Sequence, residues 1–226
     1  MFLAYLLLGI GAFLLGAVPF GFLAGKRKGI DLRKVGSGNI GATNTFRALG
    51  WKTGTVVFLL DAMKGFLPVF VATHLPAYLQ HPTFDKHGWG AMAVGIVAML
   101  GHIFSPFLGF KGGKGVAAAL GVLIGLSPIL ALIAFVVFVT TVWLTKYVSL
   151  GSMLSATVQA ILIWFWPGQL LAAQVFGTFA AVFIVIRHKD NIKRLMNGTE
   201  NKFSFKKKEA GTETETEESD SEESTG

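Results

Sequence analysis

The sequence predicts an all-α integral membrane protein, a polytopic bundle of seven transmembrane helices. Of its 226 residues, 52% are hydrophobic and only 15% are charged, which is more apolar surface than a soluble domain of this length usually hides. Apolar runs recur along the chain, near the length of about 20 residues that a span needs. Lysine and arginine gather in alternate connections, the pattern that orients membrane proteins.

The expected spans follow these apolar runs in order: 2–25, 54–73, 89–108, 115–126, 128–145, 148–166 and 169–187. The first run lacks a basic start and a clear cleavage site, so we expect a retained span rather than a signal peptide. Pro106 should bend the end of the third span. Pro128, preceded by Ser127, divides the run 115–145 into two short spans, because proline ends or kinks a helix.

The basic residues predict the orientation. Eighteen of the 20 lysines and arginines lie in the first, third and fifth connections and after the last span, whereas the stretch 74–88 holds only Lys86. This asymmetry places the N-terminus outside and the C-terminus in the cytoplasm. Dividing the run 115–145 also brings the three polar stretches of the chain to that cytoplasmic face.

Residues 1–208 are expected to form the membrane domain, and 209–226 an acidic, disordered tail. The tail holds eight of the 13 acids and no apolar anchor, a composition typical of solvated segments. The absence of cysteine excludes disulfides, a thiolate nucleophile and a cysteine-based metal site. Sparse acids argue against a carboxylate-bound metal, so we expect no metal and no cofactor.

A glycine-rich stretch, Gly109-Phe-Lys-Gly-Gly-Lys-Gly-Val116, stands directly before an apolar run. Glycines let backbone N–H groups approach an anion, and a helix starting near Gly115 would aim its positive end at the same point. The stretch is not a Walker A loop, because Gly115 stands where Ser or Thr is required. It indicates a phosphate cradle; the alternative is a flexible turn with two surface lysines.

Two further polar stretches carry candidate ligands. In the first, at 36–47, Ser37, Asn39, Thr43 and Asn44 supply neutral hydrogen-bonding groups, and Arg47 could grip a phosphate bidentately. The alternative there is a capped surface loop, with Arg47 facing lipid headgroups.

The last polar stretch, at 187–200, follows the final span. At helical spacing Arg187, Asn191 and Arg194 share a face, with His188 beside them. The pair Asn197-Gly198 should stop the helix, so that Glu200 can fold back. The alternative is a basic anchor with an incidental histidine.

Three ionisable residues lie inside expected spans. Asp61 and Lys64 stand three positions apart in the second span, where charge is costly and counts as a functional candidate. The alternative is that the two simply neutralise each other. His102 is expected to hydrogen-bond inside the helix bundle.

Cationic, glycine-rich stretches at one face of a membrane bundle favour acyl or alkyl transfer to a phosphorylated acceptor. The H-x-x-x-x-D pair of thioester-using glycerolipid acyltransferases is absent. A donor activated by phosphate would need little beyond positioning and cationic stabilisation.

Three sequences carry a resemblance to a known family: G-S-G-N-I-G-A-T-N-T-F-R, G-H-I-F-S-P-F-L-G-F-K-G-G-K-G-V-A and R-H-K-D-N-I-K-R-L-M-N-G-T-E. They resemble, in order, the three motifs of the bacterial acyl-phosphate:glycerol-3-phosphate acyltransferases (PlsY). The resemblance implies a seven-helix inner-membrane enzyme with its active site facing the cytoplasm. Such an enzyme moves a fatty acyl group from acyl phosphate, not from acyl-CoA or acyl carrier protein, to the 1-hydroxyl of glycerol 3-phosphate. The products are lysophosphatidic acid and phosphate, in phospholipid biosynthesis; the acidic tail departs from the family pattern.

The expected partners are glycerol 3-phosphate, long-chain acyl phosphate and membrane lipids, with no nucleic acid. The candidate catalytic residues are Ser37, Arg47, His188, Asn191 and Glu200. The candidate substrate-binding residues are Asn39, Thr43, Asn44, Lys64, Gly109, Lys111, Gly112, Gly113, Lys114, Gly115 and Arg194.

Our mechanistic hypothesis is direct attack on the acyl carbonyl without an acyl-enzyme. The proton leaves to a substrate phosphate or to His188, and the sequence leaves both open. A transporter of a phosphorylated solute is the main alternative function, although it should carry repeated halves and charges near the midplane. A lipid-binding scaffold would explain the basic face but not the gathered Ser, Asn, Thr and Gly.

Overall fold

The computed structural model describes residues 1–81 and 83–203, and within these residues all regular structure is helical. The expected tail, 209–226, lies outside the described residues. The elements are α1 (Phe2–Ala17), α2 (Phe20–Arg27), α3 (Ala42–Leu49), α4 (Trp51–Tyr78), α5 (Trp89–Ile103), the 3-10 turn η1 (Pro106–Leu108), α6 (Val116–Leu126), α7 (Pro128–Thr145), α8 (Val148–Phe165), α9 (Leu171–Arg187) and α10 (Lys189–Met196).

Proline and glycine mark the start of several helices. Pro19 separates α1 from α2, and Pro128 begins α7, since proline lacks the N–H that a helix interior needs. Gly50 and Gly115, at φ of 82° and 86°, stand before α4 and α6, in a backbone region that favours glycine. Helix α5 ends at Ile103 and the 3-10 turn η1 begins at Pro106, while the bend expected at Pro106 stays a prediction.

The helices agree closely with the expected spans, but their number is only partly supported. Five segments are long and apolar enough to cross a membrane: Phe2–Arg27, Trp51–Tyr78, Trp89–Leu108, Pro128–Thr145 and Val148–Phe165. Leu171–Arg187 would make a sixth together with α10, from which it is bent by 58°. The eleven-residue α6 is shorter than these spans. The protein is therefore membrane-embedded with five or six such spans among the described residues, and the seventh stays a prediction.

Small residues let the inner helices approach closely. A Cβ built on Gly65 of α4 would lie 2.1 Å from the carbonyl oxygen of Ala118, and one on Gly121 of α6 would lie 1.9 Å from that of Ala62. Helices in membranes associate through such small-residue contacts, because lipid gives no hydrophobic drive for association. The short helix α6 is thus held at the centre of the bundle.

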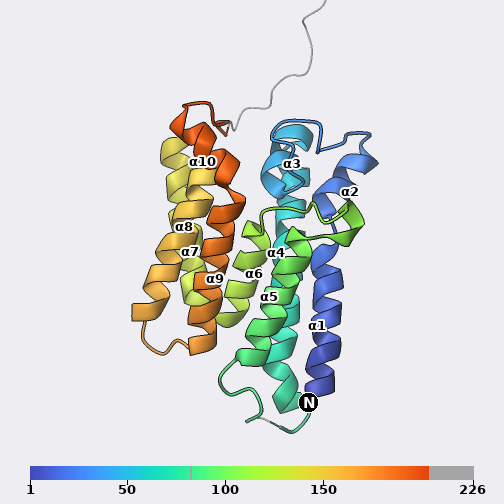
Figure 1. The fold of residues 1–226 in the computed structure, drawn as a ribbon, viewed down its shortest axis with the longest axis vertical. Helices are drawn as coiled ribbons and strands as arrows, with labels where there is room; N and C mark the ends of the chain where they lie inside the picture. The colour runs from blue at the N-terminus through green and yellow to red at the C-terminus, as the bar shows by residue number, and fades with distance from the viewer. Residues whose placement is uncertain (82, 204–226) are drawn as a thin grey trace, which may run out of the picture.

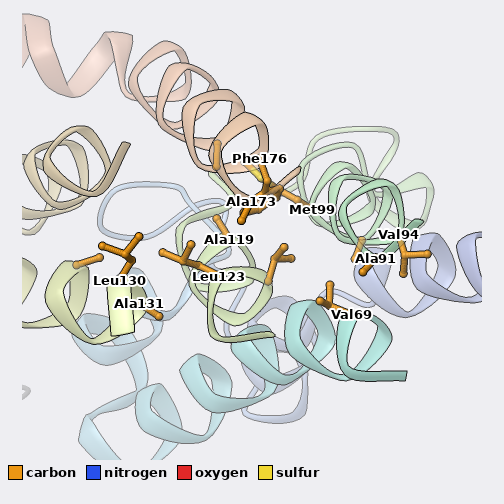
Figure 2. Packing of buried hydrophobic residues seen from close by; sticks show 14 of the residues in the cluster. Val69, Ala91, Val94, Met99, Ala119, Leu123, Leu130, Ala131, Ala173 and Phe176 are labelled. Carbon is orange, nitrogen blue, oxygen red and sulfur yellow. The ribbon is translucent and has the colours of Figure 1, made fainter. Parts of the chain in front are cut away.

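The apolar core links α1 and α4 to α9. Its buried members include Val69, Met99, Val122 and Phe176, and Figure 2 shows part of this cluster. Large apolar side chains such as Leu132 and Trp143 are exposed instead, as expected for helices that face lipid.

The polar stretches converge at one end of the bundle. In Figure 1 the helices α2 and α3 lie on one side and α10 on the other side of the same end of the bundle, opposite the N-terminus. Hydrogen bonds join Lys114 to Asn191 and Arg47 to Asn201, so segments far apart in the sequence meet there.

Candidate active site

The glycine-rich loop, residues 109–115, folds back onto the end of α5. The N–H of Gly112 donates to the Ile103 carbonyl at 3.0 Å, and the N–H of Gly113 donates to the His102 carbonyl at 3.1 Å. A Cβ on Gly113 would lie 2.1 Å from Nε2 of His102, so only glycine fits. Because these two N–H groups bind protein backbone, an anion here would depend on other groups of the loop.

Those groups are the start of α6 and the two lysines. The first N–H groups of a helix have no partner within it and carry partial positive charge, and α6 starts directly after Gly115. Lys111 is exposed, whereas Lys114 is half-buried. Burial lowers the pKa of Lys114 to about 8, although the Glu200 carboxylate opposes that shift. The loop therefore presents a cation that titrates near neutral pH beside a helix N-terminus.

The last polar stretch forms a hydrogen-bonded chain that ends on Lys114. Lys114 Nζ donates to Asn191 Oδ1, and Asn191 Nδ2 donates to Glu200 Oε1 at 2.7 Å. Ser149 Oγ donates to the same oxygen, and Arg194 Nε donates to Glu200 Oε2, both at 2.7 Å. Burial raises the pKa of Glu200, but the donated hydrogen bonds and Arg194 hold it below its ordinary value.

The expected fold-back of Glu200 is confirmed. Helix α10 ends at Met196, and Gly198 follows with φ of 70°. The carboxylate returns over the helix and is buried. Three donors fill its oxygens, so the geometry suits a residue that orients Asn191 and Arg194.

His188 stands at the bend between α9 and α10, just beyond the apolar helix. Its Nδ1 lies 2.7 Å from the Ile184 carbonyl oxygen, an acceptor that requires Nδ1 to carry the proton and leaves Nε2 as an acceptor. Burial, and next the charge of Lys114, lower the pKa of His188 to about 4. The imidazole is neutral at pH 7. Its neighbour Arg187 donates to the Gly113 carbonyl at 3.4 Å.

In the first polar stretch, Asn44 holds the loop together. Its Nδ2 donates to the carbonyls of Leu32 and Val35, both at 3.0 Å, and its Oδ1 accepts from the N–H of Ser37 at 2.9 Å. The side chain is buried and all of these groups act within the loop. Direct substrate binding by Asn44 stays a prediction, and its contacts favour an indirect role.

The other neutral residues of this stretch are more accessible. Ser37 is exposed, and Thr43 is half-buried. Asn39 Oδ1 accepts from the N–H of Gly41 at 2.9 Å, just before α3. Helix α3 starts directly after Gly41, so Asn44 and Arg47 lie three positions apart on it.

Arg47 joins the first stretch to the last. Its Nη2 donates to the Asn201 carbonyl at 3.1 Å, and Glu200 and Arg194 lie close enough to affect its charge. Within the described residues its buried Nε has no hydrogen-bond partner. A buried donor without a partner is expensive, so Arg47 has hydrogen-bonding capacity left for a ligand.

Lys64 lies elsewhere. Its Nζ is 2.7 Å from Oδ1 of Asp61, and both side chains are buried inside the bundle. The two charges neutralise each other, which was one of the two interpretations of this pair; substrate binding by Lys64 stays a prediction.

An apolar cavity opens beside the polar groups, with about 580 Å³ of empty space including its opening. Val116 and Ile184 line its end nearest the loop and His188, while Leu123, Ala134 and Gln159 line it further along their helices. Sequence reasoning missed this cavity, because five separate helices contribute its walls. The sequence analysis also missed Ser149, because its contact with Glu200 joins two distant segments. The sequence shows only a serine at the start of a span, three positions after Lys146.

In the part of the chain that the structure describes, no three His, Asp or Glu side chains gather in a way that could hold a metal ion. The converging groups are instead cations, amides and one carboxylate. They suit the binding of phosphate esters beside an apolar chain.

Comparison with known proteins gives a consistent answer. The family model described as "Glycerol-3-phosphate acyltransferase" matches residues 6–198. A glycerol-3-phosphate acyltransferase of Trichlorobacter lovleyi is 47% identical over 195 residues, 85% of this chain and 94% of the relative. A glycerol-3-phosphate acyltransferase of Aquifex aeolicus is 43% identical over 198 residues, which are 88% of this chain and 98% of the relative.

Solved structures are similar as well. A crystal structure of PlsY (YgiH), described as an integral membrane glycerol 3-phosphate acyltransferase in its glycerol 3-phosphate form, has a TM-score of 0.82 and 40% identity. The superposition covers 89% of this chain and 96% of the PlsY chain. The lysophosphatidic acid form has a TM-score of 0.79 and 39% identity, with the same coverage. The chain therefore belongs to the glycerol-3-phosphate acyltransferase family.

Proposed function

We propose that the protein transfers a fatty acyl group from acyl phosphate to the 1-hydroxyl of glycerol 3-phosphate. The observation that carries this proposal is the meeting of Lys114, Asn191 and Arg47 beside an apolar cavity. Cations and amides suit the phosphates of the two substrates, and the cavity suits a chain of carbon atoms. The two PlsY structures are a glycerol 3-phosphate form and a lysophosphatidic acid form. These two molecules are the acceptor and a product of the proposed reaction.

The phosphates occupy the cationic side of the site. Lys114, exposed Lys111 and the start of α6 receive one phosphate. Arg47, whose Nε has no partner within residues 1–81 and 83–203, receives the other. Positive groups fixed before the reaction stabilise the charge that develops on the leaving phosphate. Ser37, Asn39 and Thr43 lie on the same polar stretch as Arg47 and orient the acceptor.

The chemistry is direct acyl transfer. The 1-hydroxyl oxygen attacks the acyl carbonyl carbon, an ester bond forms, and the bond from that carbon to the donor phosphate breaks as phosphate leaves. The hydroxyl proton passes to a substrate phosphate, whose second pKa is about 6. His188, with a pKa of about 4, is the weaker base and accepts a hydrogen bond at Nε2 instead.

Three residues act by positioning. Asn44 shapes the loop that carries Ser37, while Glu200 fixes Asn191 and Arg194. Asn191 in turn fixes Lys114. Truncating any of them would displace groups that contact substrate, and small displacements of such groups reduce rates strongly.

The acyl chain lies in the cavity. Val116 follows the glycine loop directly, and the Ile184 carbonyl accepts the hydrogen bond of His188. These two lining residues connect the cavity to the polar site. A chain entering there would be shielded from water by Phe176 and the surrounding helices.

The same proposal includes seven passes of a bacterial inner membrane, with the active site facing the cytoplasm. Helix α6 leaves the glycine loop, and α7 returns to Lys146, whose carbonyl accepts the N–H of Phe203 near the site. The pair α6–α7 thus supplies one pass down and one back. The basic connections support a cytoplasmic site, with residues 1–208 as the membrane domain and 209–226 as a separate tail.

Reconstituted vesicles separate this proposal from transport of a phosphorylated solute. Labelled glycerol 3-phosphate and palmitoyl phosphate are added to purified protein in lipid vesicles. Label recovered as lysophosphatidic acid supports acyl transfer. Unmodified label that accumulates inside the vesicles would support the transporter instead.

A further inference from the structure

The break between α1 and α2 lies inside the membrane bundle and is closed by other helices. Pro19 interrupts the helical hydrogen-bond pattern there. Lys64 Nζ of α4 donates to the Val18 carbonyl at 2.9 Å, and Ser105 Oγ donates to the Ala17 carbonyl at 2.6 Å. Both donors are buried, so the broken helix is satisfied from α4 on one side and from the end of α5 on the other.

A cluster of ionisable groups surrounds this break. Lys64 pairs with Asp61 at 2.7 Å, and His102 Nδ1 lies 3.7 Å from the same carboxylate oxygen. The three residues are only 2%, 2% and 5% exposed. Ionisable groups at this depth are costly for a membrane protein, and the reaction described above uses none of them.

The cluster contacts the glycine loop. The His102 carbonyl accepts from the N–H of Gly113, and its Nε2 fills the space where a Cβ on Gly113 would lie. The Ser105 carbonyl accepts from the N–H of Phe110 at 2.8 Å. Phe110 and Gly113 of the loop are thus fixed to residues that lie beside Asp61 or bind the helix break.

The other side of the break contacts the first polar stretch. Helix α2 leads from Pro19 into that stretch, and Gly21 approaches it so closely that a Cβ would lie 1.8 Å from the Ile40 carbonyl oxygen. The same Cβ would lie 3.1 Å from Oγ1 of Thr45, next to Asn44. Any shift of the break therefore moves the segment that carries Ser37 and Arg47.

We propose that Lys64, with Asp61, His102 and Ser105, is a positioning device that holds the first polar stretch and the glycine loop in register with each other. Lys64 fixes the α1–α2 break, and His102 and Ser105 carry the loop on the same support. The proposal rests on the acyl transfer proposed above, because the two segments bind the two phosphates of that reaction. In this proposal Lys64 does not contact either substrate, but it affects the binding of both.

The main test variant is the double substitution Asp61→Asn/Lys64→Met. Removing Lys64 alone would leave a buried carboxylate without its partner, which destabilises a protein strongly. The double variant stays neutral in the membrane and keeps an amide near His102. It removes the ion pair, the donor to Val18 and the ammonium that lies over the Phe20 ring. Wild-type activity, measured first, tests the proposed reaction separately from this inference.

The expected result is a rise of at least tenfold in the KM of both glycerol 3-phosphate and acyl phosphate, with a lower kcat, per mole of monodisperse protein. A residue that only stabilises the fold would reduce the amount of folded protein but leave both KM values unchanged. Wild-type constants in the folded double variant would overturn the proposal.

Tyr5→Phe is the matched control. Tyr5 joins the same two helices at the opposite end, where its hydroxyl donates to the Ala72 carbonyl at 2.8 Å. Its kinetic constants should equal those of the wild type. If Tyr5→Phe changed both KM values as the double variant does, general loosening of the bundle would explain the effect and the proposal would fail.

Ser105→Ala is a milder variant should the double variant not fold. It removes the bond to Ala17 and nothing larger, and it should raise both KM values in the same direction. Hydrogen exchange gives a readout that is independent of activity. Amides at 36–41 and at 110–113 should exchange faster together in Ser105→Ala, and faster exchange in one segment alone would contradict the coupling.

Discussion

Lys114 and Asn191 lie in direct contact, with the ammonium group donating to the amide oxygen across 77 positions of sequence. This contact ties the loop before α6 to the helix after α9. Asn191 also donates to Glu200, so the position of the Lys114 charge depends on a carboxylate that never touches it directly. This contact joins the glycine-rich loop, 109–115, and the last polar stretch, 187–200, into one site.

The pH dependence of the reaction should reflect Lys114. Burial lowers its pKa to about 8, so the cation is present at pH 7 and is lost as the pH rises. Because kcat/KM reports the free enzyme, it should fall about tenfold per pH unit above that pKa. Lys114→Arg keeps the charge at high pH, and its kcat/KM should stay flat up to pH 10. An unchanged alkaline limb in this variant would exclude Lys114 as its origin.

Gly113→Ala should reduce activity without unfolding the protein. The added Cβ would lie 2.1 Å from His102 Nε2, so the loop or the buried His102 ring must shift. Displacing a substrate-binding loop by an ångström lowers kcat/KM by roughly 100-fold. Gly11→Ala is the control, since a Cβ there meets nothing within 4 Å, and it should behave as the wild type. Equal kinetics of the two variants would contradict the tight fit of the loop.

His188→Gln should retain most of the turnover. The low pKa of the imidazole makes it a poor base, and Gln can still accept a hydrogen bond near the position of Nε2. We expect kcat within roughly tenfold of wild type, whereas loss of a general base typically costs about 10² to 10⁴. If kcat fell by that much and no change of pH restored it, His188 would be the base that accepts the hydroxyl proton.

Ala134→Phe should shift the preference for acyl-chain length. Ala134 lines the cavity, eleven residues from the end of α7 nearest the site, which is about 16 Å along a helix. The added phenyl ring should lower kcat/KM for palmitoyl phosphate roughly tenfold and leave kcat/KM for octanoyl phosphate unchanged. Val136→Phe, on the same helix but 54% exposed, should change neither. Equal losses with both donors would place the acyl chain elsewhere.

The positions of the helices were readable from the sequence. Apolar runs, with Pro128 and Gly115 at two of their ends, gave boundaries within a few residues of the observed ones. The break at Pro19, inside the expected span 2–25, was not predicted. The number of spans was harder to predict, because α6 has only 11 residues. A short apolar helix at the centre of a bundle has the same composition as a short span.

The roles of single residues depended on contacts that no local pattern contains. Asn44 has the chemistry of a ligand, yet the carbonyls of Leu32 and Val35 occupy its amide. His102 lies inside the bundle as expected, but its Nδ1 makes no hydrogen bond among the described residues. Its support of Gly113 depends on how the loop folds back. The cavity needed five helices to be placed together.

The most direct test of the account is phosphate release by purified protein in lipid, given palmitoyl phosphate with and without glycerol 3-phosphate, beside a palmitoyl-CoA control. We expect phosphate release that requires the acceptor, with an equal amount of lysophosphatidic acid and no turnover of the CoA ester. Turnover of palmitoyl-CoA without use of palmitoyl phosphate would contradict the proposed donor, and no product from either donor would contradict acyl transfer itself.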